Sequence, residues 1–106
     1  MKKKATRRQP YKDYEKSLLK ALKDPAEAAA YLNAALEEND PVLFLTAYYN
    51  VARAHGMKKI ADAAKLHRVS LKKMLSKKGN PEWKSLFKVL TASKLRLRIE
   101  PTPLAA

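Results

Sequence analysis

Two Asp-Pro pairs, Asp24-Pro25 and Asp40-Pro41, divide the first half of this chain into segments. An Asp side chain accepts hydrogen bonds from the free N–H groups of a first helical turn, and proline has the fixed φ that the first helical position needs. Each pair therefore predicts a helix start. Together with apolar side chains at helical spacing, these signals predict six helices, at about residues 11–23, 25–38, 41–55, 57–64, 68–78 and 82–93.

Apolar stripes on these segments define the expected core. The stripes consist of Ala28, Leu32, Ala35 and Leu36; Phe44, Ala47, Tyr48 and Val51; and Trp83, Leu86, Phe87 and Leu90. Because the aromatic members and Tyr31 lie at helical spacing with other apolar residues, we expect them in the core and not stacked on bases. Gly56 and Gly79, the only glycines, follow predicted helix ends, where a residue with positive φ is common. The expected fold is a compact all-α bundle of five to six helices.

The period changes after the last predicted helix. Residues 94–99, KLRLRI, alternate basic side chains with the apolar Leu95, Leu97 and Ile99, which is typical of a strand. No other segment resembles a strand that would pair with it. We therefore expect this short C-terminal strand either to pair across a homodimer or to extend the sheet of another protein.

The domain organisation follows from the same pattern. Residues 1–10 are expected to form a flexible basic arm, residues 11–100 one folded domain and residues 101–106 a flexible tail. The arm either makes additional contacts with DNA or RNA, or serves only as a disordered leader that increases solubility. The first helix of the domain, at 11–23, carries Tyr11 and Tyr14, and it either completes the core or offers a surface to a partner.

Charge is the strongest compositional signal. The chain has 23 Lys and Arg against 10 Asp and Glu, a net charge of +13. Residues 53–98 hold fourteen of these bases but only two acids, Asp62 and Glu82. Charge concentrated in one structured segment is better explained by a polyanionic partner than by solubility alone.

Several other functions lack the residues that they need. There is no cysteine, which excludes disulfides and thiolate metal sites, and no apolar run approaches the roughly 20 residues of a membrane span. His55 and His67 have no accompanying carboxylate cluster, the serines lack a His-acid pairing, and no Gly-rich phosphate loop occurs. We therefore expect a cytoplasmic protein that is not an enzyme, with no metal, cofactor, small-molecule substrate or membrane contact.

The most informative spacing lies between residues 57 and 78. Two short helices that cross closely need an apolar and then a small residue on the first helix, an apolar plug in the turn, and inward apolar residues on the second. These positions are filled by Ile60, Ala61, Ala64, Leu66, Leu71, Met74 and Leu75. The pattern predicts a helix-turn-helix whose second helix is the recognition helix.

The outward face of that second helix is predicted to contact DNA. The 3.6-residue period places its basic and polar side chains, with Ser76 one turn later, away from the core. The candidates for reading bases are His67, Arg68, Val69, Ser70, Lys72 and Lys73. The candidates for binding phosphates are Lys58, Lys77, Lys78, Asn80 and Lys84.

Beyond the helix-turn-helix pattern, residues 24–100 as a whole resemble the small antitoxins of HigBA-type modules, often called addiction module antidote proteins. The telling pieces are YLNAALEENDP, the helix-turn-helix and the KGNP that follows the recognition helix. Such proteins belong to the Xre, lambda-repressor-like class. The resemblance implies a protein that neutralises an mRNA-cleaving, RelE-like toxin. It also implies a homodimer that binds a palindromic operator in its own promoter and represses the operon.

Two positions depart from that family pattern. Lys65 stands in the turn where glycine is usual, and its backbone is expected to need positive φ. His67 stands where Ser or Thr usually caps the recognition helix. Two other functions stay open: a phage- or plasmid-type repressor without a toxin, and a general RNA-binding or ribosome-associated protein.

Overall fold

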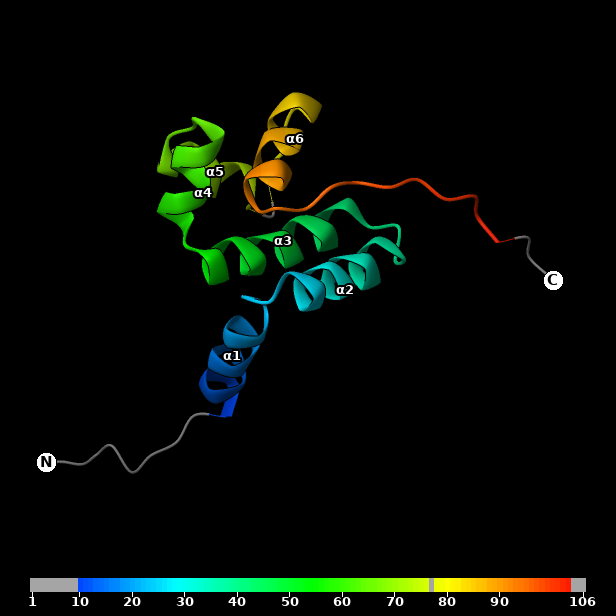
Figure 1. Ribbon diagram of the computed structural model, residues 1–106, viewed down its shortest axis with the longest axis horizontal. Helices are drawn as coiled ribbons and strands as arrows, with labels where there is room; N and C mark the ends of the chain where they lie inside the picture. The colour runs from blue at the N-terminus through cyan, green and yellow to red at the C-terminus, as the bar shows by residue number, and fades with distance from the viewer. Residues whose placement is uncertain (1–9, 77, 104–106) are drawn as a thin grey trace, which may run out of the picture.

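The computed structural model describes residues 10–76 and 78–103. Within these ranges the chain forms six α-helices, as predicted (Figure 1). Most boundaries lie within two residues of the predicted ones, but the fifth helix ends four residues before its predicted end at residue 78. The helices are α1 (Pro10–Ala21), α2 (Pro25–Leu36), α3 (Pro41–His55), α4 (Met57–Ala64), α5 (Arg68–Met74) and α6 (Trp83–Ala92).

Both Asp-Pro pairs begin helices, as the sequence predicts. The Asp24 Oδ1 atom accepts a hydrogen bond from the Ala26 N–H group at 3.0 Å, at the start of α2. The Asp40 Oδ1 atom accepts from the N–H groups of Val42 at 3.0 Å and Leu43 at 3.4 Å, at the start of α3. Each pair supplies an N-cap followed by proline in the first turn.

α3 is the central helix. α2 lies alongside it and α1 packs against it from below in Figure 1, while α4 contacts α3, α5 and α6. One continuous apolar core joins all six helices. Its buried side chains are those of Leu22, Ala28, Leu32, Ala35, Phe44, Leu45, Ala47, Tyr48, Val51, Ala52, Ala54, Ile60, Ala61, Ala64, Leu71, Leu75, Val89 and Leu90.

The predicted core position is wrong for three residues. The Leu36 side chain is 43 % exposed, Phe87 is 49 % exposed and Trp83 is 63 % exposed. The buried face of α6 is formed by Val89 and Leu90, with Leu86 partly buried, and it continues to Ser93 just after the helix, so the helix is rotated relative to the predicted stripe. Both faces have the spacing i, i+3, i+4, i+7, and the sequence period alone does not choose between them.

A buried hydrogen-bonded group explains the observed rotation of α6. The Tyr48 phenol of α3 is fully buried, and its oxygen lies 2.8 Å from the Val89 carbonyl oxygen. The Ser93 hydroxyl lies 2.8 Å from the same carbonyl oxygen and contacts the Tyr48 hydroxyl. Burial raises the pKa of Tyr48 to about 12, and the hydrogen bond with Ser93 opposes part of that rise. Buried hydroxyls need partners, so this group fixes the face that α6 turns to the core.

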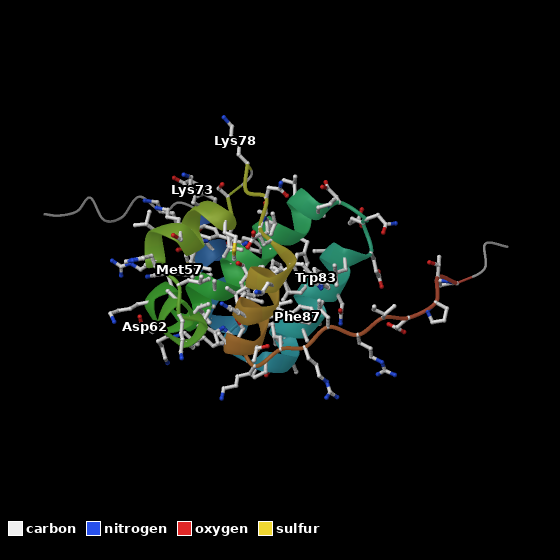
Figure 2. The ribbon with its side chains drawn as sticks, turned by 90° about the horizontal axis from the view of Figure 1, so that it is seen from above. Met57, Asp62, Lys73, Lys78, Trp83 and Phe87 are labelled. Atoms are coloured by element: carbon white, nitrogen blue, oxygen red, sulfur yellow. The ribbon has the colours of Figure 1, made fainter. Side chains whose placement is uncertain are left out.

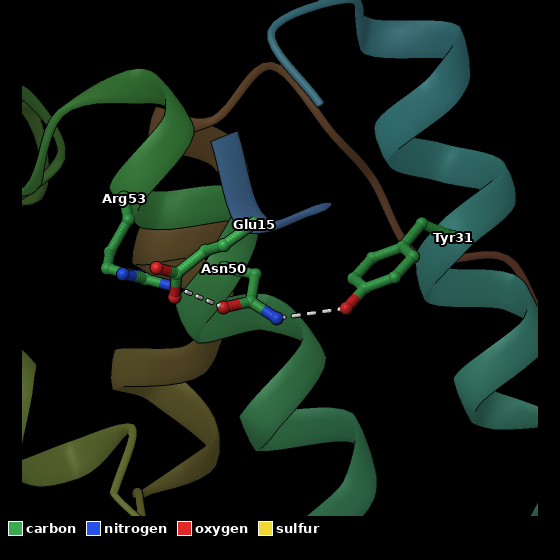
Figure 3. Close-up of polar contacts among 4 residues, drawn as sticks. All are labelled: Glu15, Tyr31, Asn50 and Arg53. Atoms are coloured by element: carbon green, nitrogen blue, oxygen red, sulfur yellow. Dashed lines mark hydrogen bonds and ion pairs between the residues drawn. The ribbon is translucent and has the colours of Figure 1, made fainter. Parts of the chain in front are cut away.

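α1 is attached to the other helices through a polar chain of contacts (Figure 3). The Arg53 guanidinium of α3 donates from Nη2 to Glu15 of α1 and to the Asn50 side-chain oxygen, both at 2.9 Å. The Asn50 amide then donates to the Tyr31 hydroxyl of α2 at 2.9 Å. Apolar contacts supplement this chain, because Leu22 just after α1 is buried. α1 therefore completes the core, while Tyr11 and Tyr14 remain exposed.

The predicted C-terminal strand is wrong. No residue in the described ranges, 10–76 and 78–103, is in a β-strand. After α6 the segment of residues 95–103 runs away from the helices (Figure 1), with Leu95 packed against the core and Ile99 94 % exposed. The alternating pattern is present, but a strand requires a paired neighbour for its backbone groups, and the described chain supplies none.

Other predictions on the ends of the chain lie outside the described residues. These are the basic arm, except Pro10, and the last three residues of the predicted tail. The tail residues 101–103 are exposed. None of the described helices is long and apolar enough to cross a membrane.

Candidate nucleic-acid interface

α4 and α5 are joined by a turn of three residues, Lys65 to His67. Lys65 has φ 58° and ψ 46°, so the predicted positive φ is confirmed. The Lys65 N–H donates to the Asp62 carbonyl oxygen at 3.1 Å, and the Leu66 N–H donates to that of Ala61 at 2.8 Å. This is a Schellman ending, in which a left-handed residue closes a helix and reverses the chain.

The apolar positions predicted for this pair of helices lie inside. Ile60, Ala61, Ala64, Leu71 and Leu75 are buried, and Leu66 and Met74 are partly buried against the same core. Contacts of α4 with both α5 and α6 hold the pair in place. Because Leu71 and Leu75 are fixed inward, the rotation of α5 about its own axis is also fixed.

The opposite face of α5 is exposed. All six residues predicted to read bases, and Ser76 with them, lie on the surface, and the Val69 side chain is 78 % exposed. No Asp or Glu occurs between Asp62 and Glu82. The face is therefore basic, exposed and free of carboxylates from its own segment. Its contact with bases stays a prediction.

His67 precedes α5 in extended backbone conformation and makes no side-chain capping hydrogen bond. Its ring is exposed beside Arg68, the first residue of the helix. The predicted loss of a good cap is thus confirmed. α5 has seven residues, and packing through Leu71 must supply the stability that a cap would otherwise add.

The described residues predicted to bind phosphates lie on α4 (Lys58), on the segment after α5 (Lys78 and Asn80) and on α6 (Lys84). Lys78, Asn80 and Lys84 are exposed, and Figure 2 shows Lys78 extending away from the body of the protein. The exposed Lys58 Nζ lies 2.9 Å from Asp62 Oδ2, a surface ion pair that solvent screens strongly. Lys77 lies outside the described residues.

Sequence reasoning missed an exposed aromatic pair. The rings of Trp83 and Phe87 stand side by side on α6, with centroids 4.9 Å apart and a tilt of 45° (Figure 2). Phe87 also lines a shallow groove between the end of α4 and α6. The groove is bordered by lysines from α6 and from the chain just after each helix, namely Lys65, Lys84, Lys88 and Lys94.

Charge is divided between parts of the fold. Residues 24–52, which contain α2 and most of α3, hold five acids and no Lys, Arg or His. The excess of bases therefore lies in α4 to α6, the segments beside them and the N-terminal residues. A polyanion is attracted to the α4–α5 side of the molecule and repelled by the α2–α3 side. Among the described residues, no group of three or more His, Cys, Asp or Glu side chains is arranged to hold a metal ion.

Comparisons with known proteins agree with part of the resemblance. A family model described as "Probable addiction module antidote protein" matches residues 13–101. An uncharacterized protein of Haemophilus influenzae is 37 % identical over 79 residues, which cover 74 % of this chain and 81 % of that protein. No solved structure matches the chain.

Proposed function

This chain belongs to the family of probable addiction module antidote proteins, and we propose that it is a DNA-binding antitoxin that represses its own operon. In this proposal the α4–α5 pair is a helix-turn-helix of the Xre, lambda-repressor-like class. The partner is an mRNA-cleaving, RelE-like toxin encoded beside it, as in HigBA-type modules. The protein acts by binding and not by catalysis, in the cytoplasm.

One observation carries the DNA-binding part of the proposal. The turn geometry at Lys65 and the buried Leu71 and Leu75 fix α5 so that Arg68, Lys72 and Lys73 all project outward. An α-helix fits the major groove of DNA, where Arg and Lys donate to guanine edges and an apolar side chain such as Val69 meets a thymine methyl group. Lys78, Asn80 and Lys84 then bind phosphates on either side of the recognition helix.

We further propose a homodimer on a palindromic operator. A two-fold axis places the two recognition helices about one turn of DNA apart, roughly 34 Å. The extended segment of residues 95–103 supports this proposal, because exposed Leu97 and Ile99 alternate with Arg96 and Arg98. The backbone of residues 96–99 makes no hydrogen bond with the described residues, which suits pairing with another strand. It becomes a strand either against its copy across the axis or at the edge of the toxin's sheet.

The toxin also needs a surface that leaves α5 free. α1 offers one, because exposed Tyr11 and Tyr14 lie on a helix whose Leu22 end is fixed to the core. Tyrosines give large contact areas at a small cost in side-chain entropy and are enriched at protein interfaces. Substituting both tyrosines with Ser weakens toxin binding and leaves DNA binding unchanged if this assignment holds.

The proposal is tested with the protein's own upstream DNA and the adjacent gene. Footprinting with purified protein detects a protected, two-fold symmetric site if the protein represses its operon. Co-expression with the adjacent gene, followed by a growth assay and co-purification, detects neutralisation of a toxin. A footprint without any toxin partner favours a phage- or plasmid-type repressor. Binding to RNA without a footprint contradicts the DNA assignment.

A further inference from the structure

A second basic site, separate from the α5 face, lies in a largely open cavity at the surface between α1 and the end of α3. Its volume is about 580 Å³. Five of its eight lining residues carry basic side chains and none is acidic. The lining consists of Lys16, Leu19, Lys20, Lys23, Arg53, Ala54, His55 and Gly56.

The three lysines reach this cavity from one side of α1 and the segment just after it. Lys16 and Lys20 are four residues apart, so they are neighbours on the helix surface, and Lys23 continues the same side. Like charges at this spacing repel each other, and α1 gains nothing in stability from the arrangement. An anion bound between them removes the repulsion.

Arg53 and His55 form the opposite wall. The Arg53 Nη2 atom donates hydrogen bonds to Glu15 and Asn50 (Figure 3). The Arg53 Nε atom is buried and has no hydrogen-bond partner among the described residues. The His55 Nδ1 atom lies 3.1 Å from the Val51 carbonyl oxygen, which assigns the proton to Nδ1 in the neutral ring. Glu15 offsets part of the charge of Arg53, and the three lysines have no such carboxylate in the cavity lining.

The cavity adjoins the first helix of the proposed helix-turn-helix. Gly56 lines it and is followed at once by Met57, the first residue of α4, and by Lys58, a candidate phosphate ligand. Gly56 has no side chain that caps the helix, and no side chain among the described residues accepts from the first-turn N–H groups of α4. Basic side chains and free N–H groups are thus gathered at the same end of α4.

We propose that this cavity binds phosphate groups, and that these are phosphates of the DNA backbone next to the bases read by α5. The inference rests on the proposed DNA binding. It extends the DNA-binding surface to α1, so the first helix of the domain helps to position the recognition helix. The contact carries no base information, because phosphates are the same in every sequence.

The test compares two variants with the same loss of charge in the full-length protein. The cavity variant is Lys16→Gln, Lys20→Gln, Lys23→Gln. The control variant is Lys12→Gln, Lys88→Gln, Lys94→Gln, which changes three exposed lysines that do not line the cavity. Affinity for a fluorescent operator duplex and for a scrambled duplex is measured from low to moderate salt.

The cavity variant is expected to bind both duplexes about tenfold or more weakly than the wild type. The plot of log affinity against log salt becomes shallower by about 0.9 for each phosphate that the variant no longer neutralises. The control variant changes that slope by less than about 0.9. Equal slopes and affinities for the two variants overturn the proposal.

A second measurement distinguishes the DNA backbone from a free phosphate compound as the ligand. Pyrophosphate is added to each protein and thermal unfolding is followed. If it stabilises the wild type but not the cavity variant, while both variants bind DNA equally, the site takes a free phosphate compound and the backbone assignment is overturned.

An Arg68→Ala, Lys72→Ala variant, measured in parallel, separates this inference from the proposed function. If that variant loses DNA binding while the cavity variant keeps it, only the inference about the cavity fails. If the wild type binds no DNA, the proposed function fails as well.

Discussion

The phenolic oxygen of Tyr48 on α3 lies 2.8 Å from the main-chain oxygen of Val89 on α6, inside the core. The contact spans 41 residues of sequence and fixes which side of α6 faces α3. Because α4 packs against α6 and α5 packs against α4, the same contact also supports the position of the α5 face. A buried polar pair thus contributes to a surface that it does not touch.

The raised pKa of Tyr48 predicts a specific loss of stability at high pH. Its pKa rises from the usual value of 10 to about 12 in the folded protein because burial disfavours the phenolate. The folded state therefore holds its proton more tightly than the unfolded state. Below about pH 10 this pKa difference contributes roughly 2–3 kcal/mol to the free energy of unfolding. The contribution is lost as the pH rises to about 12.

Tyr48→Phe removes the titrating hydroxyl, so its unfolding stability is compared with that of the wild type. Below about pH 9 the variant is expected to be about 1–2 kcal/mol less stable, because it loses the buried hydrogen bonds of the phenol with Val89 and Ser93. Urea unfolding of both proteins between about pH 8 and pH 12 measures the difference. We expect the advantage of the wild type to shrink and then reverse as the pH rises. A difference that stays constant with pH contradicts the raised pKa.

Lys65→Gly is expected to stabilise the protein. Lys65 has φ 58° in the turn, a conformation that costs a side chain with Cβ on the order of 1 kcal/mol and costs glycine little. Lys65→Ala is the control, because it removes the charge but keeps Cβ. The midpoint of urea unfolding should rise for Gly and not for Ala. A glycine variant that unfolds earlier than the wild type argues against the turn geometry.

Gly79→Ala is expected to destabilise the protein, for a different reason from the one predicted. The structure gives Gly79 no positive φ, but a Cβ there would overlap the Met74 carbonyl oxygen. The segment after α5 must then move, at a cost of about 1–3 kcal/mol. Lys78→Ala at the exposed neighbouring position is the control and should change the unfolding free energy by less than about 0.5 kcal/mol. Equal effects of the two substitutions would refute the close approach.

The exposed position of Trp83 changes the expected cost of its replacement. Trp83→Ser should cost only about 0.5–1.5 kcal/mol, the stabilisation expected from its pairing with Phe87. Leu90→Ala, in the buried face of α6, should cost about 2–5 kcal/mol. Chemical denaturation of both variants ranks them. A larger loss for Trp83→Ser would support the stripe predicted from the sequence over the observed rotation of α6.

Local signals in the sequence predicted the helices and the turn between α4 and α5. Asp24 and Asp40 act within their own first turns, and Lys65 acts within its own turn, so the chemistry needed to place them lies within a few residues. The inward residues Leu71 and Leu75 follow from spacing alone.

Contacts between distant segments account for the errors. The face of α6 depends on Tyr48, 41 residues away from Val89, and two stripes of equal spacing compete within α6. The segment of residues 94–99 has a strand pattern, but a strand also needs a partner. The cavity beside α4 combines α1 with the end of α3, and the arrangement of its lysines around Arg53 appears only in three dimensions.

The central claim is that the exposed face of α5 binds DNA, and one affinity comparison tests it most directly. Fluorescence anisotropy at fixed salt measures binding of the upstream duplex to the wild type and to an Arg68→Ala, Lys72→Ala, Lys73→Ala variant with unchanged thermal stability. Because each base-reading side chain is worth about 1–3 kcal/mol, affinity should fall by at least about 100-fold, and the preference over scrambled DNA should vanish. Unchanged affinity and preference in the variant would contradict the account.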